Sequence, residues 1–379
     1  MTLPKTYMQM FSTLTPEGAL KMELVEQLMP TPKPNQVIVR VEASPINPSD
    51  LGVMFGMATM GEATSSGSGK DISLAAPVSA QGMRVMKARI GAPLPVGNEG
   101  AGTVVAAGDG EVAQSLMGKV VAVMGGGMYG QYRCVDAATC MPLSPGDTAK
   151  DGASSFVNPL TALSMIETMR MEGHTALVHT AAASNLGQML NRICKTDKVD
   201  LVNIVRNKDQ VKILKDMGAK YIVDSSSENF LAELTDAIHA TGATLAFDAT
   251  GGGTLASTIL SAMEGAAART PGAYSIYGSV KHKQVYLYGG LDTSATVLTR
   301  GYGMAWGVGG WLLPNFLAKA GGEVASRLRM RVVKELKTTF ASHYTDEISL
   351  SDALQRDTVA RYLEKKTGQK FLVCPQSDI

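Results

Sequence analysis

A regular alternation of strand-like and helix-like segments begins near residue 155 and constrains the fold more than any other feature. Short apolar runs there read as strands, and the segments between them have helical spacing. The expected strands are 177–179, 200–205, 221–223, 245–249, 273–277 and 284–288, and the expected helices are 186–194, 209–217 and 228–240. Strands that alternate with helices form a parallel sheet with helices on both faces. The sequence therefore predicts an α/β fold built on a doubly wound parallel sheet.

The part of the chain before this alternation reads as β-rich. Residues 36–43 alternate apolar and polar side chains, and 102–107 and 119–124 are short β-branched runs next to glycine. Residues 58–92 show little periodicity, and we expect their centre, 63–71 (ATSSGSGKD), to be a mobile loop, either a functional lid or a disordered insert. Because 379 residues exceed one ordinary core, two domains are expected.

Composition excludes several classes of partner. The formal net charge is +1, which gives no support for binding nucleic acid or a membrane surface. The partner that we expect is a small-molecule substrate. The four cysteines form no CxxC pair, and a reducing, cytoplasmic location is expected. The N-terminus has no signal-peptide core, and no window approaches the ~18 apolar residues of a membrane span.

Residues 179–190, HTAAASNLGQML, join a strand to a helix through small residues. A dinucleotide pyrophosphate binds at such a helix N-terminus, where the backbone must come close to the phosphates. We expect Asn185 to occupy the position where glycine would be easiest, because asparagine tolerates the left-handed conformation. The alternative is a turn that only packs closely. The candidate cofactor-binding residues are Ala182, Ala183, Ser184, Asn185, Leu186 and Gly187.

The end of the next expected strand carries cations. In NAD sites an acidic residue ~20 positions after the turn binds the ribose hydroxyls. Here Arg206 and Lys208 stand at the strand end without an acid. Such groups suit a ribose 2′-phosphate, so NADPH is the expected cofactor. The alternative is that both are solvated surface charges.

The chain resembles the medium-chain dehydrogenase/reductase superfamily across most of its length. The resemblance rests on eight segments in order: VEASPINPSD (41–50), LPVGNEGAGTVVAAGDG (94–110), GKVVAVM (118–124), FVNPLTAL (156–163), AAASNLGQ (181–188), NIVRNKD (203–209), DMGAKYIVDS (216–225) and FDATGGG (247–253). It implies a GroES-like catalytic domain over 1–155 with the insertion 58–92, a Rossmann NADP(H)-binding domain over 156–317, and a return of 318–379 to the catalytic domain. It also implies an active site in the cleft between the domains.

Zinc members of this superfamily carry Cys in the first motif and GHE in the second, where this chain has Asn47 and Asn98. Catalytic zinc typically needs three ligands of Cys, His or carboxylate type, so no metal is expected. The resemblance is then to the zinc-free branch, with its NADPH:quinone oxidoreductases and 2-enoyl thioester reductases. The enoyl reductases have a tyrosine acid soon after the first motif, but this chain has no tyrosine between Asp50 and Tyr129.

The resemblance also implies roles for single residues. Asn47 would donate a hydrogen bond to the substrate oxygen, or else shape its loop, and Tyr132 would be an acid or stand in a pocket wall. Asn158, Thr161 and Gly289 would contact the cofactor. Trp311 would line an acyl pocket or pack at a subunit interface. Residues 285–290 and 307–313 would form the seam of a homodimer. His179 is read as structural, and Tyr274, Tyr277, Tyr286 and Tyr288 are read as packing residues.

Three functions stay open at this point. The first is a zinc-independent NADPH-dependent oxidoreductase that transfers hydride to a quinone or another conjugated carbonyl. The second is an enoyl thioester reductase with an atypical proton donor. The third is a non-catalytic NADPH-binding sensor.

Overall fold

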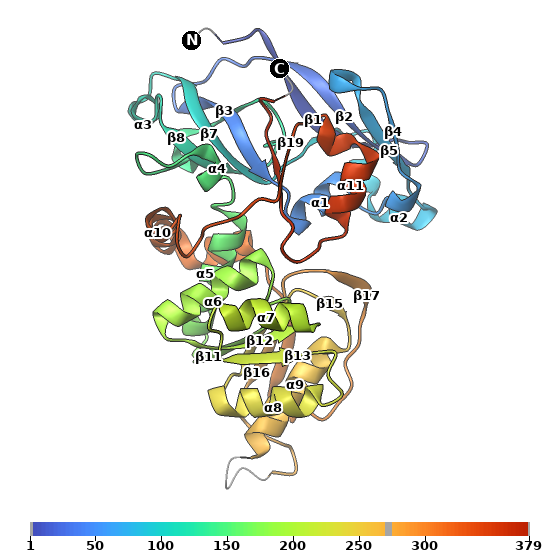
Figure 1. Ribbon diagram of the computed structural model, residues 1–379, viewed down its shortest axis with the longest axis vertical. Helices are drawn as coiled ribbons and strands as arrows, with labels where there is room; N and C mark the ends of the chain where they lie inside the picture. The colour runs from blue at the N-terminus through green and yellow to red at the C-terminus, as the bar shows by residue number, and fades with distance from the viewer. Residues whose placement is uncertain (1–2, 270–274, 378–379) are drawn as a thin grey trace. The chain divides into compact units, whose positions relative to one another are not determined.

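The computed structural model describes residues 3–269 and 275–377, which form two compact units (Figure 1). The first unit comprises residues 1–157 and 331–379, and the second comprises 158–330. The change of unit therefore falls inside helix α10 (Leu313–Lys334) and not at the expected 317/318 boundary. Gly321 interrupts this helix with a φ of 86°, so α10 is two helices joined at a glycine.

Two sheets build the first unit. A five-stranded sheet has the order β4-β5-β2-β1-β6, and a seven-stranded sheet has the order β10-β8-β7-β3-β20-β19, with β9 also paired to β3. Strand β20 pairs antiparallel with β3, so the end of the chain adds a strand to a sheet begun near residue 36. The strands are β1 (Thr6–Leu14), β2 (Ala19–Leu28), β3 (Gln36–Pro45), β4 (Thr64–Ser66), β5 (Ser73–Pro77), β6 (Leu94–Pro95), β7 (Glu99–Ala107), β8 (Val120–Met124), β9 (Tyr132–Asp136), β10 (Met141–Pro142), β19 (Asp346–Ile348) and β20 (Phe371–Val373).

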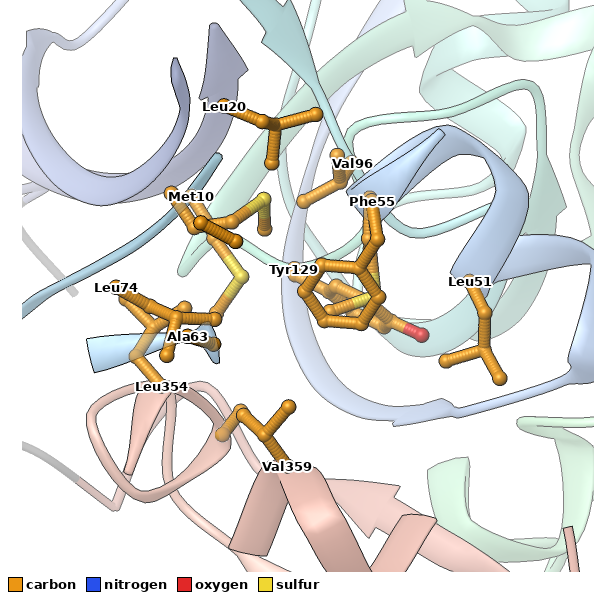
Figure 2. Packing of buried hydrophobic residues seen from close by; sticks show 14 of the residues in the cluster. Met10, Leu20, Leu51, Phe55, Ala63, Leu74, Val96, Tyr129, Leu354 and Val359 are labelled. Atoms are coloured by element: carbon orange, nitrogen blue, oxygen red, sulfur yellow. The ribbon is translucent and has the colours of Figure 1, made fainter. Parts of the chain in front are cut away.

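Short helices connect these strands and cover the sheets. They are α1 (Pro48–Phe55), α2 (Ala80–Val85), α3 (Glu111–Ser115), α4 (Ala149–Gly152) and α11 (Arg356–Leu363). Side chains from β1, β2, β5, α1 and the C-terminal segment meet in one hydrophobic core, which includes Met10, Leu74, Leu354 and Val359 (Figure 2). The two ends of the chain are therefore held in the same unit by shared apolar burial.

The structure differs from the mobile loop expected at 63–71. These residues form β4, a turn at Gly67 with a φ of 76°, and a short 3₁₀ helix, after which β5 pairs with β2. The signal that was overlooked lies just downstream, since Ile72, Leu74, Ala76 and Val78 are buried at alternate positions. That period of two is the mark of a strand with one face in the core. The insertion thus extends the five-stranded sheet.

The second unit confirms the predicted fold class. Its six-stranded sheet has parallel pairing throughout and the order β13-β12-β11-β14-β16-β18. In chain order this is 3-2-1-4-5-6, the strand order of the Rossmann fold. The strands are β11 (Ala176–His179), β12 (Asp200–Val205), β13 (Tyr221–Asp224), β14 (Leu245–Asp248), β16 (Lys283–Leu287) and β18 (Trp306–Gly310), and β15 (Gly251–Gly253) pairs separately with β17 (Asp292–Thr296).

Helices cover both faces of this sheet, with α6 and α7 on one side and α8 and α9 on the other (Figure 1). The bounds are α5 (Val157–Met171), α6 (Asn185–Asp197), α7 (Lys208–Asp216), α8 (Phe230–Thr241) and α9 (Leu255–Ala268). The strand expected at 273–277 lies partly outside the described residues, as does Tyr274, and residues 275–277 lie in a turn. No helix found within the described ranges combines the length and the hydropathy needed to span a membrane.

Candidate functional site

The turn after β11 joins strand to helix by close backbone approach. Ser184 is the N-cap of α6, and its hydroxyl accepts a hydrogen bond from the Gly187 amide at 3.1 Å. A Cβ on Gly187 would lie 2.2 Å from the Ala182 carbonyl oxygen, so only glycine fits there. The helix N-terminus therefore lies directly behind the end of the first strand, where a dinucleotide fold places the pyrophosphate.

The backbone of this turn differs from the expectation at one residue. Ala181, with a φ of 50°, takes the left-handed conformation, and Asn185 is the first residue of α6. The Ala182 amide donates to the Ile204 carbonyl at 3.2 Å, and the Ser184 amide donates to the Ala181 carbonyl at 3.0 Å. Ala182 and Ser184 thus shape the turn through their own hydrogen bonds, while the side chains of Ala182 and Ala183 are buried beneath it.

Arg206 and Lys208 lie where the sequence predicts them, just past the end of β12. Both are exposed, and neither side chain takes part in an ion pair within the described residues. The Arg206 amide donates to the Gln210 side chain at 3.0 Å, which fixes the backbone of this strand end. Lys208 begins α7, where a cation opposes the helix dipole. Two exposed cations thus lie beside the end of the second strand.

The neighbouring strand ends complete this edge of the sheet. Thr180, after β11, donates its hydroxyl hydrogen to Asp248 at the end of β14 at 2.7 Å. Asp248 also accepts from the amides of Thr250 and Gly251, which orders the loop that follows β14. A Cβ on Gly289 would lie 2.6 Å from the Ala249 carbonyl oxygen, so the backbone after β16 packs directly on the backbone after β14.

The remaining candidates of the second unit lie on or against α5. Asn158 and Thr161 are both buried, and their spacing of three residues puts them on one face of the helix. The Trp311 indole donates to the Thr168 hydroxyl at 3.1 Å, and its ring packs edge-on against Phe247. The structure thus shows Trp311 in a packing position on the sheet.

A buried polar cluster in the first unit surrounds Asn47. The Asn47 side chain, 2% exposed, donates to Glu99 Oε1 at 2.8 Å, while Glu99 Oε2 accepts from the amides of Phe156 and Val157 at 2.8 and 2.9 Å. Asp50 accepts from the amides of Asn47 and Asn98 at 2.8 and 2.7 Å. Glu99 therefore holds the start of α5, and Asp50 ties the two sequence motifs together.

The charges of this cluster are strongly perturbed. Burial raises the pKa of Asp50 from 3.8 to about 7 even though two backbone amides stabilise its carboxylate, and nearby Glu99 raises it further. Burial also raises the pKa of Glu99, against the opposing effect of the Lys370 charge. Burial lowers the pKa of Lys370 to about 8, while Glu99 and Asp50 oppose this shift. Lys370 donates to the Ser154 hydroxyl at 2.7 Å, and Ser154 bonds the Tyr344 hydroxyl at 2.8 Å.

Sequence reasoning missed Asp50, Glu99 and Lys370 as members of one site. A signal existed for the first two, since both are acids within apolar motifs, but none existed for Lys370, which is distant in sequence. The other catalytic candidate, Tyr132, lies on β9 with its ring edge-on to Tyr7, at a centroid distance of 6.0 Å.

The pH dependence of stability offers a test of the Asp50 environment. Because the pKa of Asp50 is raised on folding, its protonated form stabilises the native state, and this contribution is lost as pH rises from about 4 to about 7. The unfolding free energy of the wild type minus that of Asp50→Asn should therefore fall across this interval and stay constant above it. Urea unfolding at a series of pH values measures this difference. A rise of the wild-type value relative to that of the variant with increasing pH would contradict the assignment.

Two asparagine side chains of the first unit are bound to neighbouring residues. Asn47 stands where zinc members have Cys, and its amide is bound to Glu99, while the Asn98 amide donates to the Ser49 hydroxyl at 3.2 Å. Across residues 3–269 and 275–377, no group of three or more His, Cys, Asp or Glu side chains is arranged to hold a metal ion.

Comparison with known proteins agrees with this architecture. The GroES-like domain of alcohol dehydrogenases matches residues 33–145. A Mesorhizobium loti protein assigned as an NADPH:quinone reductase has a similar structure with a TM-score of 0.74 and 27% sequence identity, over 99% of this chain and 100% of that one.

Curated relatives match over shorter segments. The chain is 25% identical over 237 residues to the synaptic vesicle membrane protein VAT-1 homolog of Rattus norvegicus, covering 62% of this chain and 51% of that protein. It is 28% identical over 203 residues to the mitochondrial enoyl-acyl-carrier-protein reductase of Xenopus tropicalis, covering 51% of this chain and 49% of that protein. The chain thus spans about half the length of these relatives. The domain match and the likeness over the whole length of the Mesorhizobium loti structure are consistent with the zinc-free branch of the medium-chain dehydrogenase/reductase superfamily, which includes quinone oxidoreductases and enoyl thioester reductases.

Proposed function

We propose that this protein is a zinc-independent, NADPH-dependent oxidoreductase that reduces a quinone or another conjugated carbonyl compound. The observation that carries the proposal is the carboxyl edge of the second unit's sheet. There a close strand–helix turn lies beside two cations, Arg206 and Lys208, and no acid ends β12. A dinucleotide with a 2′-phosphate satisfies both features. The Mesorhizobium loti structure, assigned as an NADPH:quinone reductase, supports this choice.

Each part of the cofactor has residues suited to it. Arg206 and Lys208 would bind the 2′-phosphate, and the start of α6, with the backbone amides of Ala183 and Leu186, would bind the diphosphate. Asn158, Thr161 and Gly289 would contact the nicotinamide end. Bound NADPH would supply a hydride to an electron-poor carbon of the substrate. The chain's own residues bind and orient the reactants for this transfer.

For Asn47, the geometry favours the positioning role over direct contact with a substrate oxygen. Its amide donates to the buried Glu99, which in turn holds the amides that begin α5. Asn47 would therefore keep the first motif and the start of α5 in register. The asparagines at the positions of zinc ligands are the reason that we propose catalysis without zinc.

Two further properties are proposed with the same function. Within the described part of the chain, β18 pairs with β16 on one side only, and its other edge would pair with that of a second copy in a homodimer. All four cysteines are free thiols, which favours a reducing compartment such as the cytoplasm.

An enoyl thioester reductase is the second candidate, favoured by the similarity to the enoyl-acyl-carrier-protein reductase. It would need a proton donor other than the tyrosine that is absent after Asp50. A non-catalytic NADPH-binding sensor is the third.

The oxidation of NADPH, followed at its absorbance maximum, distinguishes the three candidate functions. We expect saturable turnover with 9,10-phenanthrenequinone or 1,4-benzoquinone that a zinc chelator leaves unchanged. Turnover with crotonyl-CoA alone would favour the enoyl thioester reductase. Tight NADPH binding without turnover of any acceptor would favour the sensor.

A further inference from the structure

His179 and Tyr288 form a pair that neither the turn nor the cations explain. His179 ends β11 and is completely buried, and Tyr288 is the first residue after β16. His179 Nε2 lies 2.7 Å from the Tyr288 hydroxyl oxygen, and the two rings stack at 5.7 Å. Phe247, on the strand between them, packs edge-on against the Tyr288 ring at 6.5 Å. The pair thus bridges the ends of three strands, β11, β14 and β16.

The proton positions in this pair follow from the surroundings of His179. Burial lowers the pKa of His179 to about 3, so the ring is neutral and carries one proton. Nδ1 has no hydrogen-bond partner among residues 3–269 and 275–377. Because a buried N–H without an acceptor is rarer than a bare acceptor, the proton resides on Nε2 and is donated to the Tyr288 oxygen. The Tyr288 oxygen then accepts from His179, and its own hydroxyl hydrogen can be donated to another group.

The position of this hydroxyl indicates what it would bind. In a sheet of this order the first three strands bind the adenosine half of a dinucleotide, and the later strands bind the nicotinamide half. Tyr288 is half-buried at the end of the fifth strand in chain order and is followed by the exposed Gly289 and Gly290. Burial and the Asp248 carboxylate raise the pKa of Tyr288, so it stays a neutral donor. The same carboxylate disfavours a phosphate nearby, which leaves a neutral polar group as the acceptor.

We propose that the Tyr288 hydroxyl, oriented by His179, donates a hydrogen bond to the carboxamide oxygen of the nicotinamide ring. This inference rests on the NADPH-binding function proposed above. Tyr288 is then a binding residue that fixes the rotation of the ring, and His179 is a positioning residue that acts through it.

Equilibrium binding to Tyr288→Phe tests the proposal without relying on turnover. The probes are NADPH and 2′-phospho-ADP-ribose, which lacks only the nicotinamide. The variant keeps the ring contacts with Phe247 and His179. We expect the Kd for NADPH to rise about tenfold, as for the loss of one hydrogen bond, and the Kd for 2′-phospho-ADP-ribose to stay the same.

Tyr286→Phe is the matched control. Tyr286 also packs against Phe247, but its hydroxyl donates to Glu172 at 2.8 Å, so NADPH binding should not change. At His179, leucine should weaken NADPH binding about threefold, and glutamine, which can donate from a similar position, should restore most of it. If Tyr288 and His179 had only a structural role, their substitution would weaken the binding of NADPH and of 2′-phospho-ADP-ribose equally.

The other outcomes each overturn the idea. Equal weakening of both ligands by Tyr288→Phe would show a general effect on the fold or a contact with the ribose. Unchanged NADPH binding would show that the hydroxyl meets no part of the cofactor. If the wild-type protein binds both ligands but Tyr288→Phe does not weaken NADPH binding more than 2′-phospho-ADP-ribose binding, only this inference fails. If the wild type binds neither ligand, the proposed function fails and the inference fails with it.

Discussion

Arg206→Glu is expected to raise the Kd for NADPH about a hundredfold and to leave the Kd for NADH nearly unchanged. The guanidinium lies exposed at the end of β12 and takes part in no ion pair within residues 3–269 and 275–377, so it is available to the 2′-phosphate. A charge-assisted hydrogen bond to such a group contributes roughly 1.5–3 kcal/mol, and the introduced carboxylate adds repulsion. NADH has no phosphate at this position and loses neither interaction. Titration of each coenzyme by its fluorescence measures the two constants.

Lys215→Glu provides the control for this experiment. Lys215 lies exposed in the last turn of α7, away from the strand end, and the substitution changes the net charge by the same amount. It should alter NADPH binding little, and raising the salt concentration should reduce the effect of Arg206→Glu. Equal changes in the constants for NADPH and NADH would contradict a 2′-phosphate site at Arg206.

Glu99→Ala is expected to lower the free energy of unfolding by about 3–5 kcal/mol. The carboxylate is completely buried and accepts hydrogen bonds from the Asn47 side chain and from the amides of Phe156 and Val157. Alanine would leave these three donors buried without their acceptor and would remove one of the two carboxylates whose charge favours the charged form of Lys370. Urea unfolding followed by far-ultraviolet circular dichroism measures the change.

Glu42→Ala is the matched control on a neighbouring strand. The Glu42 carboxylate is partly exposed and accepts from Arg40 at 3.2 Å and from Thr103 at 2.9 Å, so its loss should cost about 1 kcal/mol or less. If both variants lost the same stability, Glu99 would not be the buried acceptor that holds the start of α5.

Some expectations failed because a local pattern was judged by composition alone. The segment 63–71 is rich in serine and glycine, yet it leads into a strand whose alternate residues are buried. At the turn after β11, asparagine is the non-glycine residue that best tolerates a positive φ, but the chain places that conformation at Ala181. The packing of Gly187 on Ala182 determines the path of the turn, and the preference of one side chain does not.

The sequence by itself determined the features that repeat locally. Alternating apolar runs and amphipathic segments specified strands β11 to β14 and β16 and helices α6 to α8 to within a few residues, because burial on one face imposes a period on neighbouring residues. The small residues of the turn and the cations after β12 were readable for the same reason, since a parallel sheet brings the ends of its strands to one edge.

Only the tertiary structure decided which distant side chains meet. Glu99 meets the start of α5, Lys370 reaches Ser154 across more than half of the chain, and His179 meets Tyr288 through strand order. A buried polar group must find a partner, but its own neighbours in sequence do not show which one. The partner is set by how sheets and helices pack, and that packing depends on the whole core.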